Sequence, residues 1–287
     1  MKGEAQRRRY WPAAVVLTVL GVSGLGLLAG SRQVLAEDTA SDEKPMRFVA
    51  VRSGEPGCEP TCPEWISAEG DIDEEAPARF KKLLREIKGR NLPLLLSVQR
   101  GDIGAAMALG RLLRRNGISV AVSRTAFKDC RPSEGNCRPN DPTGSRYAGV
   151  ALVSGGRCQN ECLAVLAGGV VRLAGEWPRV GPFDIADSAK GVDKRIGSYL
   201  KEMGVDPMIL DLGKTSSLKG RRLGISEMQS TGLVTLIFGA NLLVAPGVCK
   251  TSPAADNCRV FTTMDLPATM PQGNGGVATG PVAQPSE

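Results

Sequence analysis

Apolar residues follow two periods along the chain, and these periods alternate from about residue 46 to residue 262. Short apolar runs, continuous or alternating with polar residues, predict strands. Apolar residues three and four positions apart, with charged residues between them, predict helices that bury one face. The predicted strands are 46–51, 65–69, 92–98, 118–122 and 170–174, with a further short apolar run at 149–154. The predicted helices are 76–88, 103–115, 161–166 and 187–203, followed by a short one at 205–212. Residues 233–244 are apolar and fit either a strand or a helix.

One part of this pattern indicates the fold class. Residues 92–98 form a continuous apolar run, which is typical of a strand buried on both faces of a sheet. The amphipathic helix 103–115 follows, Asn116 and Gly117 end it, and another strand comes next. A strand, helix and strand within about 30 residues predict a right-handed βαβ unit with parallel strands. We therefore expect one α/β domain over residues 46–262.

The two ends of the chain differ from this domain. Arginines at positions 7–9 precede 20 residues without a charge, 11–30, and residues 34–36 resemble a small-residue cleavage site. Residues 1–36 are therefore a cleaved signal peptide or, since about 20 apolar residues can span a bilayer, a single-pass membrane anchor. Residues 37–45 are a polar linker, and the Pro- and Gly-rich residues 263–287 predict a disordered tail. Both interpretations place the domain in the periplasm, either soluble or anchored to the inner membrane, with membrane contact only through the uncleaved segment.

Charge and aromatic content argue against a nucleic-acid partner. The chain has a formal net charge of +6, but five basic residues and one acidic residue lie in its first 36 positions. The remainder has 31 basic and 29 acidic residues, a net of about +2, and shows no basic stripe. Aromatic residues make up only 4% of the chain, so stacking platforms for bases are not expected.

Eight cysteines fall into four close sequence pairs. An exported chain meets an oxidising compartment, and short loops lose little entropy on closure, so we expect structural disulfides between near neighbours. The chain has no histidine, and its C-x₃-C spacings differ from the usual zinc knuckle, so we predict no metal site and no cofactor. We expect the pair Cys130 and Cys137 to brace a surface excursion over residues 127–147. The cysteines are Cys58, Cys62, Cys130, Cys137, Cys158, Cys162, Cys249 and Cys258.

Four segments carry a resemblance to a known superfamily. Residues 94–111 contain an apolar strand, a polar turn with Gly-Asp and a helix rich in small residues. Residues 158–169 begin with Cys-Gln-Asn-Glu-Cys and end with Ala-Gly-Gly, and the segments 179–183 and 199–207 follow. This ordered set resembles the Clp-protease/crotonase-like superfamily, in particular exported bacterial relatives of the Clp protease proteolytic subunit. The resemblance implies an α/β spiral of ββα units with parallel strands, here with loops stapled by disulfides.

The catalytic positions of that superfamily are degenerate here. In active members a serine attacks an acyl carbonyl, a histidine removes its proton, and backbone N–H groups of a Gly-Gly turn hold the oxyanion. The resemblance places Asn160 at the nucleophile position, followed by Glu161, and Phe183 at the base position. The former oxyanion turn becomes Arg100-Gly101. An amide cannot replace a serine nucleophile, and a chain without histidine cannot use a Ser-His pair. The sequence predicts a pseudoenzyme that binds or acts as a scaffold, with a protein partner or a homo-oligomer as the expected context.

Other interpretations of these residues stay open. Asn160 fits a helix N-cap, and Arg100 fits a solvated loop residue or a contact to an anion at the following helix. An active hydrolase would need a Ser-Lys pair, for which the candidates are Ser97 or Ser154 with Lys190 or Lys194. Crotonase-like acyl-thioester chemistry needs coenzyme A, and export argues against that cytosolic ligand.

Overall fold

Alternation along the first two strands decides which face of the sheet receives the helices. The computed structural model describes residues 44–152, 154–183, 191–214 and 221–260. In β1 (Arg47–Ser53) and β2 (Thr61–Glu69), Phe48 and Ile66 belong to the main core beneath the helices, whereas Trp65 belongs to a smaller core on the other face. Successive side chains of a strand point to opposite faces, so the sheet is packed on both sides.

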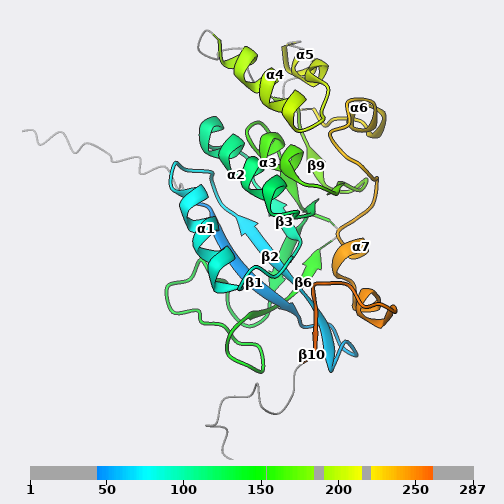
Figure 1. The fold of residues 1–287 in the computed structure, drawn as a ribbon. Coiled ribbons are helices and arrows are strands. Elements are labelled where there is room, and N and C mark those ends of the chain that lie inside the picture. Colours follow the sequence, from blue (N-terminus) through cyan, green and yellow to red (C-terminus); the bar gives the residue numbers. More distant parts are fainter. Residues whose placement is uncertain (1–43, 153, 184–190, 215–220, 261–287) are drawn as a thin grey trace, which may run out of the picture. The chain divides into compact units, whose positions relative to one another are not determined.

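Within the described ranges, eight strands form one mostly parallel sheet in the order β5-β6-β1-β2-β3-β4-β8, and β10 pairs with β2 (Figure 1). The pairs β1–β6, β2–β3, β3–β4 and β4–β8 are parallel, whereas β1–β2, β5–β6 and β10–β2 are antiparallel. The predicted α/β class is confirmed, and the spiral of ββα units stays a prediction. The other strands are β3 (Leu94–Ser97), β4 (Val120–Val122), β5 (Arg124–Phe127), β6 (Tyr147–Leu152), β8 (Arg172–Leu173) and β10 (Cys258–Val260), and β7 (Arg157–Cys158) pairs with β9 (Arg179–Val180) apart from this sheet.

The helices α1 (Ala76–Glu86), α2 (Ile103–Arg115) and α3 (Cys162–Gly168) cover one face of the sheet (Figure 1). The predicted βαβ unit is confirmed, because α2 connects β3 to β4 and these two strands pair in parallel. The carboxylate of Asp102 accepts a hydrogen bond from the N–H of Ala105 at 2.6 Å and so caps the helix start.

Small residues let α2 and α3 approach closely. A Cβ on Gly110 would lie 2.7 Å from the carbonyl oxygen of Ala164 and would collide with the hydroxyl of Tyr199. That hydroxyl donates a hydrogen bond to the same carbonyl of Ala164 at 2.6 Å, from α4 (Val192–Glu202). The contact joins three helices at a point where only glycine fits.

Several elements differ from the sequence-based expectation. The strand β2 begins at Thr61 rather than Trp65, and neither β5 nor β10 was expected. The apolar segment 233–244 is mostly irregular, with a helix only at its end and a bridge between Leu236 and Leu173. The strands β5 and β10 are short, and their backbone hydrogen bonds come from β6 and β2, which are distant in the sequence. The remaining elements are η1 (Pro207–Leu210), α5 (Asp211–Lys214), α6 (Ile225–Ser230), α7 (Asn241–Val244) and η3 (Pro246–Lys250).

All eight cysteines lie in the described ranges, and they pair with their sequence neighbours. This is the local pairing that the sequence favoured. Four disulfides indicate an oxidising, extracytoplasmic environment. The pairs are Cys58–Cys62, Cys130–Cys137, Cys158–Cys162 and Cys249–Cys258.

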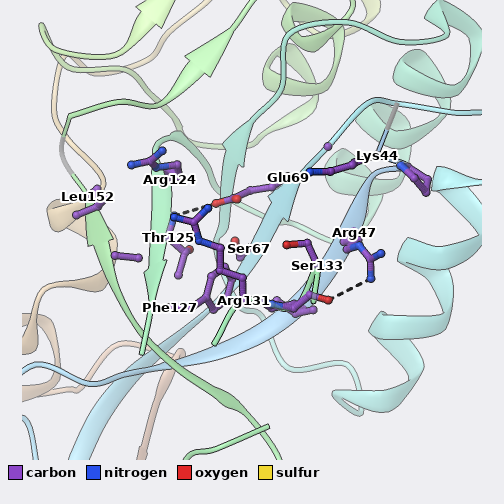
Figure 2. A pocket seen from close by; sticks show the side chains of 15 residues that line it. Lys44, Arg47, Ser67, Glu69, Arg124, Thr125, Phe127, Arg131, Ser133 and Leu152 are labelled. Carbon is purple, nitrogen blue, oxygen red and sulfur yellow. Dashed lines mark hydrogen bonds between the residues drawn. The ribbon is translucent and has the colours of Figure 1, made fainter. Parts of the chain in front are cut away.

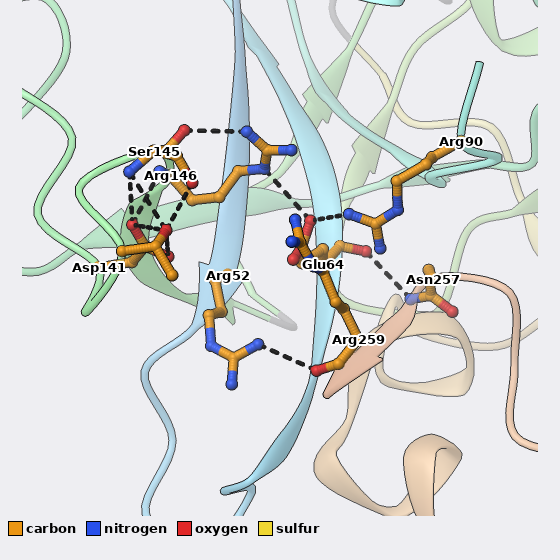
Figure 3. A network of polar contacts seen from close by, with 9 residues as sticks. Arg52, Glu64, Arg90, Asp141, Ser145, Arg146, Asn257 and Arg259 are labelled. Carbon is orange, nitrogen blue, oxygen red and sulfur yellow. Dashed lines mark hydrogen bonds and ion pairs between the residues drawn. The ribbon is translucent and has the colours of Figure 1, made fainter. Parts of the chain in front are cut away.

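A buried acidic residue connects four distant segments at one end of the sheet (Figure 3). The carboxylate of Glu64 is fully buried and accepts hydrogen bonds from Arg90 at 2.6 Å and from Arg146 at 3.2 Å. Its backbone carbonyl accepts a hydrogen bond from the side chain of Asn257 at 3.0 Å. Beside it, Arg52 is also buried and donates to the carbonyl oxygen of Arg259 at 3.3 Å. The contacts of Asn257 and Arg259 hold the C-terminal strand against the sheet.

None of the helices in the described ranges combines the length and the apolar character that a membrane crossing requires. The predicted targeting segment 1–36, most of the linker 37–45 and the tail 263–287 lie outside the described residues. The end of the linker is described, and there Pro45 forms a bridge with Asp71 directly after β2.

Candidate functional site

The turn between β7 and α3 carries the position at which the sequence resemblance placed the nucleophile. A disulfide joins Cys158, the last residue of β7, to Cys162, the first of α3, and both residues are fully buried. Asn160 stands at the apex of this closed turn with φ +51°. Asparagine is one of the few residues that tolerate this left-handed backbone. The predicted N-cap role is wrong, because Glu161 occupies the cap position and Asn160 precedes it.

The turn at Arg100-Gly101, where the sequence resemblance placed the oxyanion donors, lies beside the turn that carries Asn160. A carboxylate accepts the hydrogen bond of its Gly101 N–H. The backbone N–H of Gly101 donates to the carboxylate of Glu161 at 3.1 Å. The structure therefore brings together Gly101 and the residue after Asn160, from segments about sixty positions apart. Gly101 also lies against Ile72 so closely that an added Cβ would collide with its side chain and backbone. Packing is thus a sufficient reason for glycine at this position.

Arg100 points away from this donor toward an acidic partner. Its guanidinium pairs with the carboxylate of Asp71, with Nε and Nη2 at 3.1 and 3.0 Å from the same oxygen. The side chain is 59% exposed, as expected for a loop residue near water. The alternative contact to an anion at the start of α2 would require this ion pair to break.

Phe183 is a core residue. It follows β9 by three positions and is 2% exposed within the helix-side core. Gly213 packs directly against its backbone carbonyl. A benzyl side chain in an apolar core neither accepts nor donates a proton, so this position contributes packing.

The structure does not bring together the described members of the predicted Ser-Lys pairs. Ser97 ends β3, and its hydroxyl accepts a hydrogen bond from the backbone N–H of Arg157 at 3.3 Å. Ser154 is exposed in the turn before β7. Lys194 is exposed on α4, and no hydrogen bond or ion pair within the described ranges joins it to either serine. Lys190 lies outside the described residues.

A second candidate site is a hollow of about 340 Å³ on the face of the sheet opposite α1 (Figure 2). It lies over β1, β2, β5 and the end of β6, and the excursion braced by Cys130–Cys137 forms one wall. Among the described lining residues, the charged ones are the cations Lys44, Arg47, Arg124 and Arg131 and a single acid, Glu69. The apolar part of the lining includes Val49, Phe127 and Leu152.

Glu69 lies within the hollow as a largely buried carboxyl group. It accepts a hydrogen bond from the backbone N–H of Thr125 at 3.1 Å. Burial raises the pKa of Glu69 above its usual value, because the charged form loses its hydration. The hydrogen bond from Thr125 and the charges of Arg124 and Arg131 act in the opposite direction and lower the pKa, but burial dominates.

No family model matches the sequence, and no curated protein does so either. Among solved structures, the chain is similar to a serine-to-alanine mutant of the membrane-bound stomatin-specific protease 1510-N. The two share 13% sequence identity and a TM-score of 0.37, over 66% of this chain and 84% of that one. A likeness of this size does not place the chain in a family.

Sequence reasoning missed the hollow. Glu69, Arg124 and Arg131 come from a strand end, an unexpected strand and a disulfide-braced loop. The only local signal was that Glu69 ends an apolar strand, where a charged residue is usually solvated. The juxtaposition depends on the pairing of β5 with β6 and of β6 with β1, which no short-range pattern encodes.

Proposed function

We propose that this chain is an exported periplasmic protein with a Clp-protease-like fold that acts by binding and does not hydrolyse acyl bonds through a Ser-His pair. The observation that carries the proposal is the hydrogen bond from the Gly101 N–H to the carboxylate of Glu161. The complete lack of histidine in the chain supports the same conclusion independently of any alignment.

The electrostatics of this contact oppose acyl transfer. A tetrahedral intermediate carries a negative oxygen that must be held by backbone N–H donors about 3 Å away. Here the Gly101 donor already has a negatively charged acceptor. The carboxylate of Glu161 would repel an oxyanion that develops at this place. The N–H of Gly101 could not stabilise that oxyanion, because it already donates to Glu161. Removal of one such donor typically slows catalysis by about 10² to 10³.

The turn is instead built as a fixed surface feature. The Cys158–Cys162 disulfide closes it, and Gln159 packs across Gly181, which follows β9. The backbone of Val98 bonds to both sides of Cys158, through Arg157 and Gln159. Such bracing suits a site that presents groups to a ligand or a partner without rearrangement. We expect the N-terminal segment to direct the domain across the membrane, whether or not it is cleaved afterwards.

Labelling with a serine-directed fluorophosphonate, read by intact mass, tests the absence of serine hydrolase chemistry. The expected result is no mass increase for the folded, oxidised protein and no turnover in an esterase and peptidase screen. The Glu161→Ala variant is the matched control, because it frees the Gly101 N–H without creating a nucleophile, and it should also remain unlabelled. Stoichiometric labelling of one serine in the wild-type protein contradicts the proposal and identifies the nucleophile.

A further inference from the structure

The charge of the hollow on the sheet face points to an anionic ligand. Of the charged residues that line it within the described ranges, Lys44, Arg47, Arg124 and Arg131 are cationic, and Glu69 alone is acidic. Like charges gathered around a concave surface of low dielectric strengthen one another's field and raise the local concentration of anions. The balance of charge therefore favours a negatively charged occupant.

Two of these cations, Arg124 and Arg131, are exposed, and both act on Glu69 through their charge. Within the described ranges, no hydrogen bond or ion pair commits the guanidinium of Arg124 or that of Arg131. Figure 2 shows the two side chains on the same side of the hollow, with Arg131 directed toward Glu69. Arg47 has a different role, because it donates to the carbonyl oxygen of Pro132 at 3.1 Å and holds the excursion against β1.

The remaining lining adds an apolar wall. Val49, Phe127 and Leu152 contribute hydrocarbon surface from three neighbouring strands. The ring of Phe127 packs edge-to-face on Tyr147, with centroids 6.0 Å apart, and this contact supports the Phe127 part of the wall. A bare inorganic anion would leave this surface in contact with water, whereas an organic chain would cover it.

We propose that the hollow binds a small organic acid with an apolar chain, its carboxylate held by Arg124 and Arg131 and its chain against Val49, Phe127 and Leu152. Planar guanidinium groups match a carboxylate in paired hydrogen bonds, and the volume of about 340 Å³ suits a molecule of this size. The inference supplies a ligand class for the binding role proposed above. The ligand class is argued from the lining of the hollow and not from the Gly101–Glu161 contact. An experiment can therefore contradict one proposal and leave the other unaffected.

Isothermal titration of the full exported chain with hexanoate, at neutral pH and low salt, tests this directly. Hexanamide has the same chain without the charge, and inorganic phosphate has charge without the chain. We expect saturable binding of hexanoate, with both comparison ligands weaker by about tenfold or more. Wild-type protein that does not bind hexanoate, or that binds either comparison ligand equally well, overturns the proposal.

Single substitutions at the two arginines locate the site. Arg124→Gln and Arg131→Gln each remove one guanidinium from an exposed position, and each should weaken hexanoate binding by about tenfold or more. Arg138→Gln is the matched control, because Arg138 is an exposed arginine of the same excursion and does not line the hollow. Near-ultraviolet circular dichroism verifies that each variant is folded. Equal weakening by the control, or unchanged binding in both other variants, contradicts the assignment. A loss of binding leaves the fluorophosphonate result unaffected.

Discussion

Two glutamates show how position decides what a carboxylate does in this molecule. Glu161 accepts the N–H of Gly101 at 3.1 Å, and Glu69 accepts the N–H of Thr125 at the same distance. The first takes the donor that acyl-transfer chemistry would need. The second lies in a hollow where burial outweighs the surrounding positive charge and raises its pKa. A carboxyl group thus takes the Gly101 N–H at the first candidate site, and at the second it is the single acid among the cations of the hollow.

The raised pKa of Glu69 makes stability depend on pH. Because the folded state keeps this proton more tightly than the unfolded chain, the stabilisation is complete below the unfolded pKa and is lost as pH rises through the folded pKa. We therefore expect Glu69→Gln to gain stability relative to wild type as pH rises above about 4.5. Urea unfolding of both proteins at several values from about pH 4 to pH 7 measures the difference.

The comparison isolates one group, because Glu69 is the single acid among the described residues that line the hollow. The other charged residues of that lining are the cations Lys44, Arg47, Arg124 and Arg131, and they are the same in both proteins. A glutamine retains an oxygen that accepts the Thr125 N–H, so the hydrogen bond survives the substitution. A difference that stays constant with pH, or that favours wild type as pH rises, contradicts the prediction.

Among the elements, the approach of α2 to α3 depends on a single missing Cβ. Gly110→Ala would place a methyl group against the carbonyl of Ala164 and the hydroxyl of Tyr199. We expect a loss of about 2 kcal/mol in the free energy of unfolding, since overpacking between rigid elements typically costs about 1–3 kcal/mol. Urea unfolding measures this loss.

A second helical glycine provides the control. A Cβ on Gly197, in α4, would lie 3.7 Å from Pro207 and 3.8 Å from Leu210, which are ordinary contact distances. Gly197→Ala should therefore stabilise the protein by about 0.5–1 kcal/mol through helix propensity alone. Equal effects of the two substitutions would show that helix propensity, and not the crowded contact, governs Gly110.

Local signals explain which elements the sequence could predict. The helix 103–115 was predicted with its observed bounds from its apolar spacing and from Asn116 with Gly117 at its end. The structure adds that Asp102 caps its start. The strand β5 was missed, because it has only four residues, two of them exposed, and its hydrogen bonds come from β6 across the long excursion. The strand β10 was missed for a similar reason, since it pairs with β2 from nearly two hundred positions away.

The candidate sites also contain some features that the sequence could predict and others that it could not. Composition alone excluded a Ser-His pair, because the chain has no histidine. The link between Gly101 and Glu161 could not be predicted, because it needs the two turns to lie side by side. The hollow around Glu69 was hidden for a further reason. Its residues look like solvated surface charges until the excursion is placed over the sheet.

At the scale of the whole domain, buried polar contacts join the last described segment of the chain to β1 and β2. Arg52 donates to the carbonyl of Arg259, and Asn257 bonds to the backbone of Glu64, so residues near both ends of the described chain meet at β2. The Cys249–Cys258 disulfide closes the segment that carries β10. Unlike the hydrophobic core, these contacts are directional and select one register.

Glu64→Gln tests whether this network stabilises the fold. The substitution leaves Arg90 and Arg146 without the buried carboxylate that both contact (Figure 3). We expect a loss of roughly 3 kcal/mol in urea unfolding, near the lower limit for breaking a buried ion pair, because both arginines can still reach water. The matched control is Glu202→Gln, which breaks an exposed pair with Arg111 and should cost less than about 1 kcal/mol. If both losses are equally small, burial adds nothing to the contacts of the Glu64 carboxylate with Arg90 and Arg146, and these contacts do not stabilise the fold.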